Sequence, residues 1–289
     1  MSTAPAIVVH GGAGTSRDNE DGCTLAAGLA LAALQRGGDA LDAAVAAVVS
    51  MEDDGRFNAG TGSVLCLDGQ SIEMDAAVMD TRGRLGCVAC ITHVQNPVLV
   101  ARAVADGPHW LLAGEGATRF ARNSGHPPFC QPTEKARAAH ARLIAQLGER
   151  PEFARLWNYE RALEDRGERA CDTVGAVVRG ADGHFAVASS TGGSAPSLLG
   201  RVGDTPIIGS GFYAGMDGAV AATGIGEQIV RHLLAYTVYQ WIAGGTPIEQ
   251  ALQRGIDLFD PAVAVGLIAI GKNGHGACSN RAMPRAIIC

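Results

Sequence analysis

The sequence predicts an α/β protein in which mainly antiparallel sheets are covered by helices. The expected elements follow the order helices, strands, helices, strands, helix and hairpin, which does not fit a regular repeat of strand and helix. A second observation is an internal echo: VGAVVRGADGH at 174–184 returns as VGLIAIGKNGH at 265–275, with glycines and histidine at the same spacing. Each copy has the pattern of a β-hairpin. With 289 residues and 47% hydrophobic content, the chain can bury a sizeable core, and we expect a single domain over 1–289.

The N-terminal part begins with a strand at 6–12 that runs into a glycine turn. Two helices with small apolar faces are expected to follow, at 20–38 and 40–54. In 63–79, the pair Asp68-Gly69 separates two apolar runs, which predicts another hairpin.

A further strand is expected at 86–94, and Asn96 and Pro97 then form the N-cap and first position of a helix. Residues 133–170 are rich in charge and in helix formers, which predicts a helical surface tail. A long amphipathic helix is predicted at 227–245.

Charge and cysteine usage exclude several classes of function. The net charge of −6, without any block of Lys or Arg, argues against nucleic acid or an anionic membrane as a partner. The N-terminus has neither the basic region of a signal peptide nor a membrane-spanning run. The eight cysteines fall mostly in apolar segments and are expected to be reduced, and the lone CxxC lacks a partner for zinc. We therefore expect a cytoplasmic protein whose partner is either a small molecule or a protein.

The stretch CDTVGAVV, residues 171–178, raises the main chemical question. A threonine that opens a strand is ordinarily structural. Its hydroxyl becomes a useful nucleophile if the bond between Asp172 and Thr173 is cleaved, because the new α-amino group, with a pKa of about 7.7 to 8.0, is a built-in base. The change from a charged segment to an apolar strand at residue 172 is consistent with such a junction, but composition alone leaves both readings open.

Three later stretches favour the catalytic interpretation. SSTGG provides a second hydroxyl, Thr191, at the end of the expected strand pair. In GRVGD, Arg201 and Asp204 form either a surface ion pair of little consequence or a clamp for the carboxylate and ammonium of a free amino acid. ATGIGE, residues 222–227, offers a hydroxyl and glycine N–H groups that suit an oxyanion.

Other catalytic motifs are incomplete in this sequence. HGGAG is similar to the oxyanion loop of lipase-type hydrolases, but no G-x-S-x-G elbow accompanies it. A loose GxGxxA beginning at Gly209 is not followed by a clear helix, and GxxxxGK[ST] is absent, so nucleotide sites are not expected. We interpret His10, His184 and His275 as structural or turn residues, since an N-terminal threonine needs no histidine base.

Six motifs in series resemble one family over nearly the whole chain. IVVHGGAG, FNAGTGSVLCLDG with EMDAAVMD, CDTVGAVV, SSTGG, GRVGDTPIIGSG and ATGIGE are together similar to the plant-type L-asparaginases and isoaspartyl aminopeptidases, which are Ntn hydrolases. The resemblance implies a four-layer αββα sandwich and self-cleavage into an α subunit, 1–172, and a β subunit, 173–289. It also implies a homodimer of αβ units that hydrolyses asparagine and β-aspartyl dipeptides.

The resemblance assigns roles to individual positions. The catalytic set is Thr173, Thr191, Thr223, Gly224 and Asn58, and the substrate-binding set is Arg201, Asp204, Gly224 and Gly226. No cofactor is implied for catalysis. A structural sodium ion is implied at the backbone carbonyls of Met51, Glu52, Asp54, Phe57, Ala59 and Thr61, although MEDDGRFNAG lacks the proline often found in that loop.

Related functions share parts of the same pattern. Glycosylasparaginases share the DT junction and GRVGD, but are usually exported, and taspase-like endopeptidases typically have serine at the position of Thr191. An unprocessed, inactive scaffold of the same fold is a further alternative. The sequence does not rank asparagine against β-aspartyl dipeptides, because both present the same free α-amino and α-carboxyl groups to the predicted clamp.

Overall fold

The computed structural model describes residues 4–129, 131–148 and 173–289. The strands are β1 Ala6–His10, β2 Met74–Asp80, β3 Leu85–Ile91, β4 Leu111–Ala113, β5 Val174–Arg179, β6 Phe185–Thr191, β7 Phe212–Gly215, β8 Gly218–Gly224, β9 Val265–Gly271, β10 Gly274–Ser279 and β11 Arg285–Ile288. The α-helices are α1 Glu20–Gln35, α2 Ala40–Asp53, α3 Pro97–Val104, α4 Gly114–Asn123, α5 Glu134–Gly148, α7 Gly226–His232, α8 Leu234–Ala243 and α9 Ile248–Ile256.

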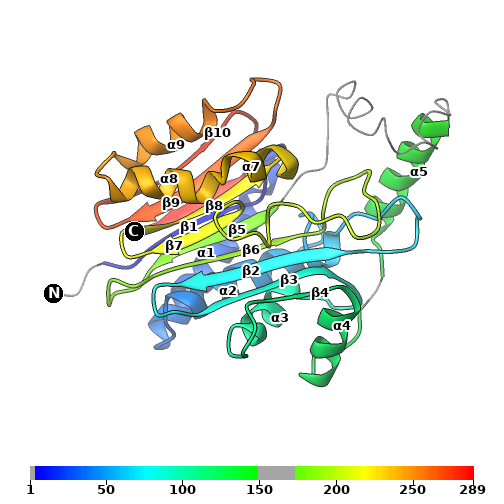
Figure 1. Cartoon of the computed structure of the whole chain (residues 1–289), viewed down its shortest axis with the longest axis horizontal. Coiled ribbons are helices and arrows are strands. Elements are labelled where there is room, and N and C mark those ends of the chain that lie inside the picture. The colour runs from blue at the N-terminus through cyan, green and yellow to red at the C-terminus, as the bar shows by residue number, and fades with distance from the viewer. Residues whose placement is uncertain (1–3, 130, 149–172) are drawn as a thin grey trace.

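The described strands form two stacked sheets between two layers of helices (Figure 1). The larger sheet has the order β11-β1-β5-β6-β2-β3-β4 and the smaller one the order β10-β9-β8-β7. All neighbours are antiparallel except β3 and β4. Helices α1 to α4 pack on the outer face of the large sheet, and α7 to α9 on the outer face of the small one. The predicted αββα fold is confirmed.

Alternation along the strands sorts the side chains between these layers. Val174, Ala176 and Val178 of β5 face the helices α1 and α2, whereas Val177 faces the second sheet. The alanine-rich faces of α1 and α2 allow these helices to lie close to one another and to the large sheet. A capping box at Asp39 starts α2, because its side chain accepts hydrogen bonds from the N–H groups of the first turn. The inter-sheet layer therefore receives one face of every central strand.

The hairpin predicted around Asp68-Gly69 is wrong. Only the second apolar run forms a strand, β2, and this strand pairs with β3. The side chain of Asp68 accepts hydrogen bonds from the N–H groups of Gln70 and Ser71, which closes a local turn without a preceding strand. The other two predicted hairpins are confirmed as β5–β6 and β9–β10.

The single helix predicted at 227–245 is also wrong, because the chain breaks at Leu233, whose φ is +43°. The N–H groups at the start of α8 are donated outside the helix, from Ala235 to the carbonyl of Ser210 and from Tyr236 to that of Gly209. The break turns Leu234 into the core while Leu233 stays exposed.

Three further expectations concern helix ends, the charged tail and membranes. Asn96 precedes α3 as predicted, but its side chain does not cap that helix and donates to Asp53 instead. The predicted helical tail is present as α5 up to Gly148, and the rest of it lies outside the described residues. None of the helices in the described part of the chain has the length and apolar character needed to cross a bilayer.

Candidate active site

A row of three polar side chains crosses the end of the large sheet. The register of β5 and β6 pairs Val174 with Ser190, so Thr173 lies one residue further, opposite Thr191. The register of β6 and β2 pairs Thr191 with Asp75. Directly opposite side chains point to the same face, with Cβ atoms about 5 Å apart. By alternation, all three face the second sheet, on the side where Val177 is buried.

Both threonines of this row are nearly inaccessible in the described structure. Thr173 and Thr191 are each 4% exposed. The hydroxyl oxygen of Thr191 accepts a hydrogen bond from the N–H of Gly193, at 3.2 Å. This bond holds the glycine turn after β6 against the end of the strand. The predicted cleavage-site residue Asp172 lies outside the described residues.

Asn58 lies against the same glycine turn. Its side-chain nitrogen donates to the carbonyl of Gly193 at 2.7 Å, and its backbone oxygen accepts from Gly192 at 2.9 Å. Its Oδ1 accepts from the N–H of Val64, at 3.1 Å. A Cβ at Gly192 would overlap that Oδ1 atom, so this approach requires glycine. The structure thus brings the loop of Asn58 next to the end of β6.

Thr223 is fully buried at the end of β8, in the second sheet. Its hydroxyl oxygen accepts a hydrogen bond from the N–H of Ala13, at 3.3 Å. The HGGAG loop, which begins at the last residue of β1, therefore belongs to the candidate site. The sequence analysis did not assign this loop to the site. Gly224 follows with φ +136°, and a Cβ there would overlap the carbonyl of Ala264, so no other residue fits without strain.

His10, at the start of the HGGAG loop, packs beside the strand that follows Thr173. The two strands pair His10 with Gly175, and a Cβ at that glycine would overlap the imidazole Nε2. Nδ1 accepts a hydrogen bond from the N–H of Gly12, at 3.3 Å. Burial lowers the pKa of His10 to about 3, and a contact with the backbone of Thr173 offsets this only in part. The ring is neutral and packs beside the site.

Arg201 and Asp204 meet at Gly226, the first residue of α7. A Cβ at this glycine would lie 3.0 Å from Arg201 Nη2 and 2.8 Å from Asp204 Oδ1. Arg201 also binds Glu227 through Nε–Oε1 and Nη2–Oε2 contacts of 2.9 Å each. Opposite charges and a residue without a side chain thus surround one point at the end of the small sheet.

The carboxylate of Asp204 is unusual for a buried acid. It is 4% exposed, and its Oδ2 has no hydrogen-bond partner among the described residues. Burial raises the pKa of Asp204 to about 7, although the positive charge of Arg201 acts in the opposite direction. A cationic ligand would satisfy this carboxylate, and an anionic one would suit Arg201.

The sequence analysis did not identify Asp75 as a site residue. Asp75 connects the row of threonines to the loop that carries Arg201 and Asp204. Oδ1 accepts from the N–H of Cys90 at 2.8 Å, and Oδ2 from the N–H of Gly203 at 3.3 Å. It is 2% exposed, and burial raises its pKa to about 6. The sequence did contain a sign of this role. Asp75 is an acidic residue inside the apolar run EMDAAVM, at a position that alternation places on the face between the two sheets.

The last turn of α2 and the loop after it contain the carbonyls that the resemblance assigns to sodium. Glycines let this loop pack closely on itself: a Cβ at Gly60 would lie 2.6 Å from the carbonyl oxygen of Glu52, and one at Gly62 would overlap that of Phe57. Backbone oxygens are suitable ligands for a hard cation, so the donor chemistry fits the ion, although the carbonyls of Asp54 and Ala59 also accept hydrogen bonds from the N–H groups of Phe57 and Gly62. Among all the described residues, no three His, Cys, Asp or Glu side chains lie together as metal ligands would.

Comparisons with known proteins find relatives over nearly the whole chain. A family model described as asparaginase matches residues 3–288. The chain is 41% identical to a plant-type L-asparaginase of Pyrococcus furiosus, over 93% of this chain and 91% of the relative. It is 36% identical to an isoaspartyl peptidase/L-asparaginase of Homo sapiens, over 93% of this chain and 88% of the relative. A protein of the same name from Macaca fascicularis is 37% identical, with the same coverage.

Proposed function

The chain belongs to the asparaginase family, and from this premise we propose that it hydrolyses the side-chain amide of L-asparagine and β-aspartyl peptide bonds. The observation that carries the proposal is that Arg201 and Asp204 converge on Gly226, in a loop that Asp75 joins to the sheet end with two buried threonines. Opposite charges that meet at one point suit the two charged groups of a free amino-acid end. The names of the relatives support the same substrates.

We propose Thr173 as the nucleophile, after cleavage of the bond that joins it to Asp172. Its hydroxyl attacks the side-chain carbonyl of the substrate, and the hydroxyl proton passes to its own α-amine. The C–N bond then breaks, and the amine returns that proton to the leaving ammonia or peptide amine. Water hydrolyses the resulting ester, which releases aspartate and restores the threonine. Thr191, opposite in the sheet, supports the attacking hydroxyl.

The negative charge that develops on the attacked oxygen needs donors on the other sheet. We assign this role to the Thr223 hydroxyl and the backbone N–H of Gly224, as the resemblance implies. The Thr223 oxygen already accepts from Ala13, which leaves its proton free to be donated to the oxyanion. Asn58 braces the glycine turn beside the nucleophile through its bond to Gly193.

The clamp determines which substrates are accepted. Arg201 binds the α-carboxylate through its planar fork, and Asp204 binds the α-ammonium. The ligand ammonium would partner the Asp204 oxygen that has none among the described residues. A substrate must therefore present both groups free on the aspartyl residue whose side chain is attacked.

The remaining expectations belong to the same proposal. A sodium ion held by the carbonyls at the end of α2 and in the loop after it would brace the loop that carries Asn58, and no step of the reaction depends on it. The cytoplasmic location and the homodimer of αβ units stay predictions.

The test is an intact-mass spectrum combined with an assay of ammonia release. We expect chains of 172 residues and 289 − 172 = 117 residues, the second beginning with Thr173. Thr173→Ala should remain a single chain and be inactive. Thr118→Ala is the matched control, since Thr118 is also a buried threonine but lies on α4 and bonds to Thr92. A full-length chain that hydrolyses asparagine would contradict the mechanism.

A further inference from the structure

We propose that Asp75 is a positioning residue for this reaction, which holds the loop of Arg201 and Asp204 in place relative to the two threonines. The inference rests on the proposed function and extends it to a residue outside the motif assignments. Asp75 stands opposite Thr191 on β2 and bonds to the backbone of Gly203, between the two clamp residues. One side chain thus joins the end of the large sheet to the clamp.

The strand geometry around Asp75 directs its side chain. Met74 pairs with Ile91 and Ala76 pairs with Val88, so Asp75 alone faces the two residues Ala89 and Cys90 of β3. This is a β-bulge, a feature that re-aims side chains and is frequent beside active sites. Cys90 has φ +48°, a strained conformation for a residue other than glycine. Its N–H is donated to the Asp75 carboxylate at 2.8 Å, which compensates part of the strain.

On the other side, Asp75 acts on Arg201 through Gly203. A Cβ at Gly203 would lie 2.8 Å from Arg201 Nη1, so the guanidinium packs directly on this glycine. The Gly203 N–H is donated to Asp75, at 3.3 Å. The thiol of Cys90 makes a second contact with the loop, 3.7 Å from the carbonyl oxygen of Arg201. The bulge therefore holds the loop at two points.

Charge adds to these contacts. The buried carboxylate of Asp75 and the guanidinium of Arg201 attract each other, and the attraction favours the ionised form of Asp75. Both oxygens of Asp75 already accept backbone hydrogen bonds. Asp75 therefore acts through the loop and is not expected to touch the substrate. Its loss should weaken substrate binding more than it slows the chemical step.

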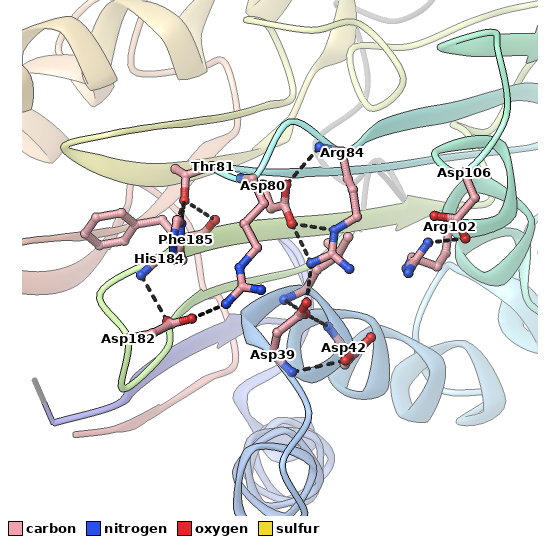
Figure 2. Close-up of polar contacts among 12 residues, drawn as sticks. Asp39, Asp42, Asp80, Thr81, Arg84, Arg102, Asp106, Asp182, His184 and Phe185 are labelled. Carbon is pink, nitrogen blue, oxygen red and sulfur yellow. Dashed lines mark hydrogen bonds and ion pairs between the residues drawn. The ribbon is translucent and has the colours of Figure 1, made fainter. Parts of the chain in front are cut away.

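Asp80 provides a matched control on the same strand (Figure 2). It is 4% exposed, and its Oδ1 accepts from the N–H groups of Arg82 and Arg84 at 3.0 Å and 2.9 Å. Five residues from Asp75, it points to the opposite face of the sheet, where Arg84 and Asp39 surround it. Asp80→Asn removes the charge of a carboxylate that is about as buried as Asp75 but makes no contact with the loop of Arg201 and Asp204.

The experiment compares cleaved wild-type enzyme with cleaved Asp75→Asn and Asp80→Asn. The asparagine side chain keeps one acceptor but turns an NH2 group toward a backbone N–H. We expect Asp75→Asn to raise KM for β-Asp-Leu and the dissociation constant of L-aspartate by about tenfold or more, from the loss of a charged hydrogen bond, with kcat changed less than about threefold. Asp80→Asn should lower the melting temperature and leave KM unchanged.

Three results would contradict the role of Asp75. An unchanged KM in Asp75→Asn, a loss confined to kcat, or equal KM effects in both variants would overturn it. If Asp75→Asn does not fold, Asp75→Glu replaces it, because a longer side chain keeps the charge and displaces both oxygens; a wild-type KM in that variant would also overturn the inference. A wild-type enzyme that binds L-aspartate without hydrolysing either substrate would refute the proposed function, while the affinities would still test Asp75.

Discussion

Arg201 and Glu227 form a two-point ion pair, with Nε–Oε1 and Nη2–Oε2 distances of 2.9 Å each. The arginine side chain is 15% exposed and the glutamate side chain 50% exposed. In the proposed mechanism, a substrate carboxylate has to compete with Glu227 for the same guanidinium, because the fork binds one carboxylate in this bidentate manner. The proposed clamp is thus occupied by an internal ligand before substrate arrives.

Glu227→Gln should strengthen substrate binding. The variant removes the competing charge and keeps the size of the side chain. Since a half-exposed ion pair contributes roughly 0 to 1 kcal/mol, we expect KM for asparagine to fall by up to about fivefold. Steady-state kinetics of the cleaved variant measure this. A higher KM would instead mean that Glu227 is needed to orient Arg201.

Arg201→Lys should impair small substrates while self-cleavage continues. The variant keeps the charge but loses the planar fork, and the cleavage of the chain requires no free amino-acid end. In the wild type, β-Asp-Leu should be hydrolysed much faster than α-Asp-Leu, because the α-linked peptide has no free α-carboxylate to take the place of Glu227 on Arg201 and so lacks a charged hydrogen bond of about 1.5 to 3 kcal/mol. Equal rates for the two peptides, or an unaffected variant, would remove the clamp from the mechanism.

Asp204→Asn should stabilise the fold at alkaline pH while it removes activity. Burial raises the pKa of Asp204 from 3.8 to about 7, so the ionised form destabilises the folded state. The penalty is absent below about pH 4 and complete above about pH 7, where three pKa units correspond to an upper bound of about 4 kcal/mol.

The measurement is the melting temperature of wild type and Asp204→Asn at pH 5 and pH 8. The gain from the substitution should be several degrees larger at pH 8. Asp106→Asn is the control, because its carboxylate is 62% exposed and should affect both temperatures little. A gain that is equal at the two pH values would contradict a buried, charged Asp204.

Gly226→Ala should weaken substrate binding without unfolding the protein. The added methyl would stand 2.8 Å from Asp204 Oδ1 and 3.0 Å from Arg201 Nη2, so these side chains must shift. We expect KM for asparagine to rise by about tenfold or more, a loss of about 1.4 kcal/mol. Gly28→Ala on α1 is the control: nothing lies within 4 Å of its Cβ, and alanine should stabilise the helix by about 0.5 to 1 kcal/mol. An unchanged KM in Gly226→Ala would argue against a ligand at this point.

The sequence by itself determined the layered fold, in which antiparallel sheets are covered by helices. Alternating apolar residues in 174–184 and 265–275 predicted two hairpins that the structure contains, because the side-chain period of a strand is local information. Local patterns failed where a distant segment competed for the backbone. The helix predicted at 227–245 breaks at Leu233, since the carbonyls of Gly209 and Ser210 take the N–H groups of α8.

The sequence motifs by themselves also predicted site roles for four residues, Thr173, Thr191, Arg201 and Asp204. Only the tertiary structure decided how these positions are connected. Asp75 reaches Gly203 across 128 residues, and Thr223 reaches Ala13 across 210. Such contacts depend on strand register and on the stacking of two sheets, in which a shift of one residue would turn every side chain to the other face. Periodicity indicates which side of a strand is buried, but the packing of the folded chain selects the partner found there.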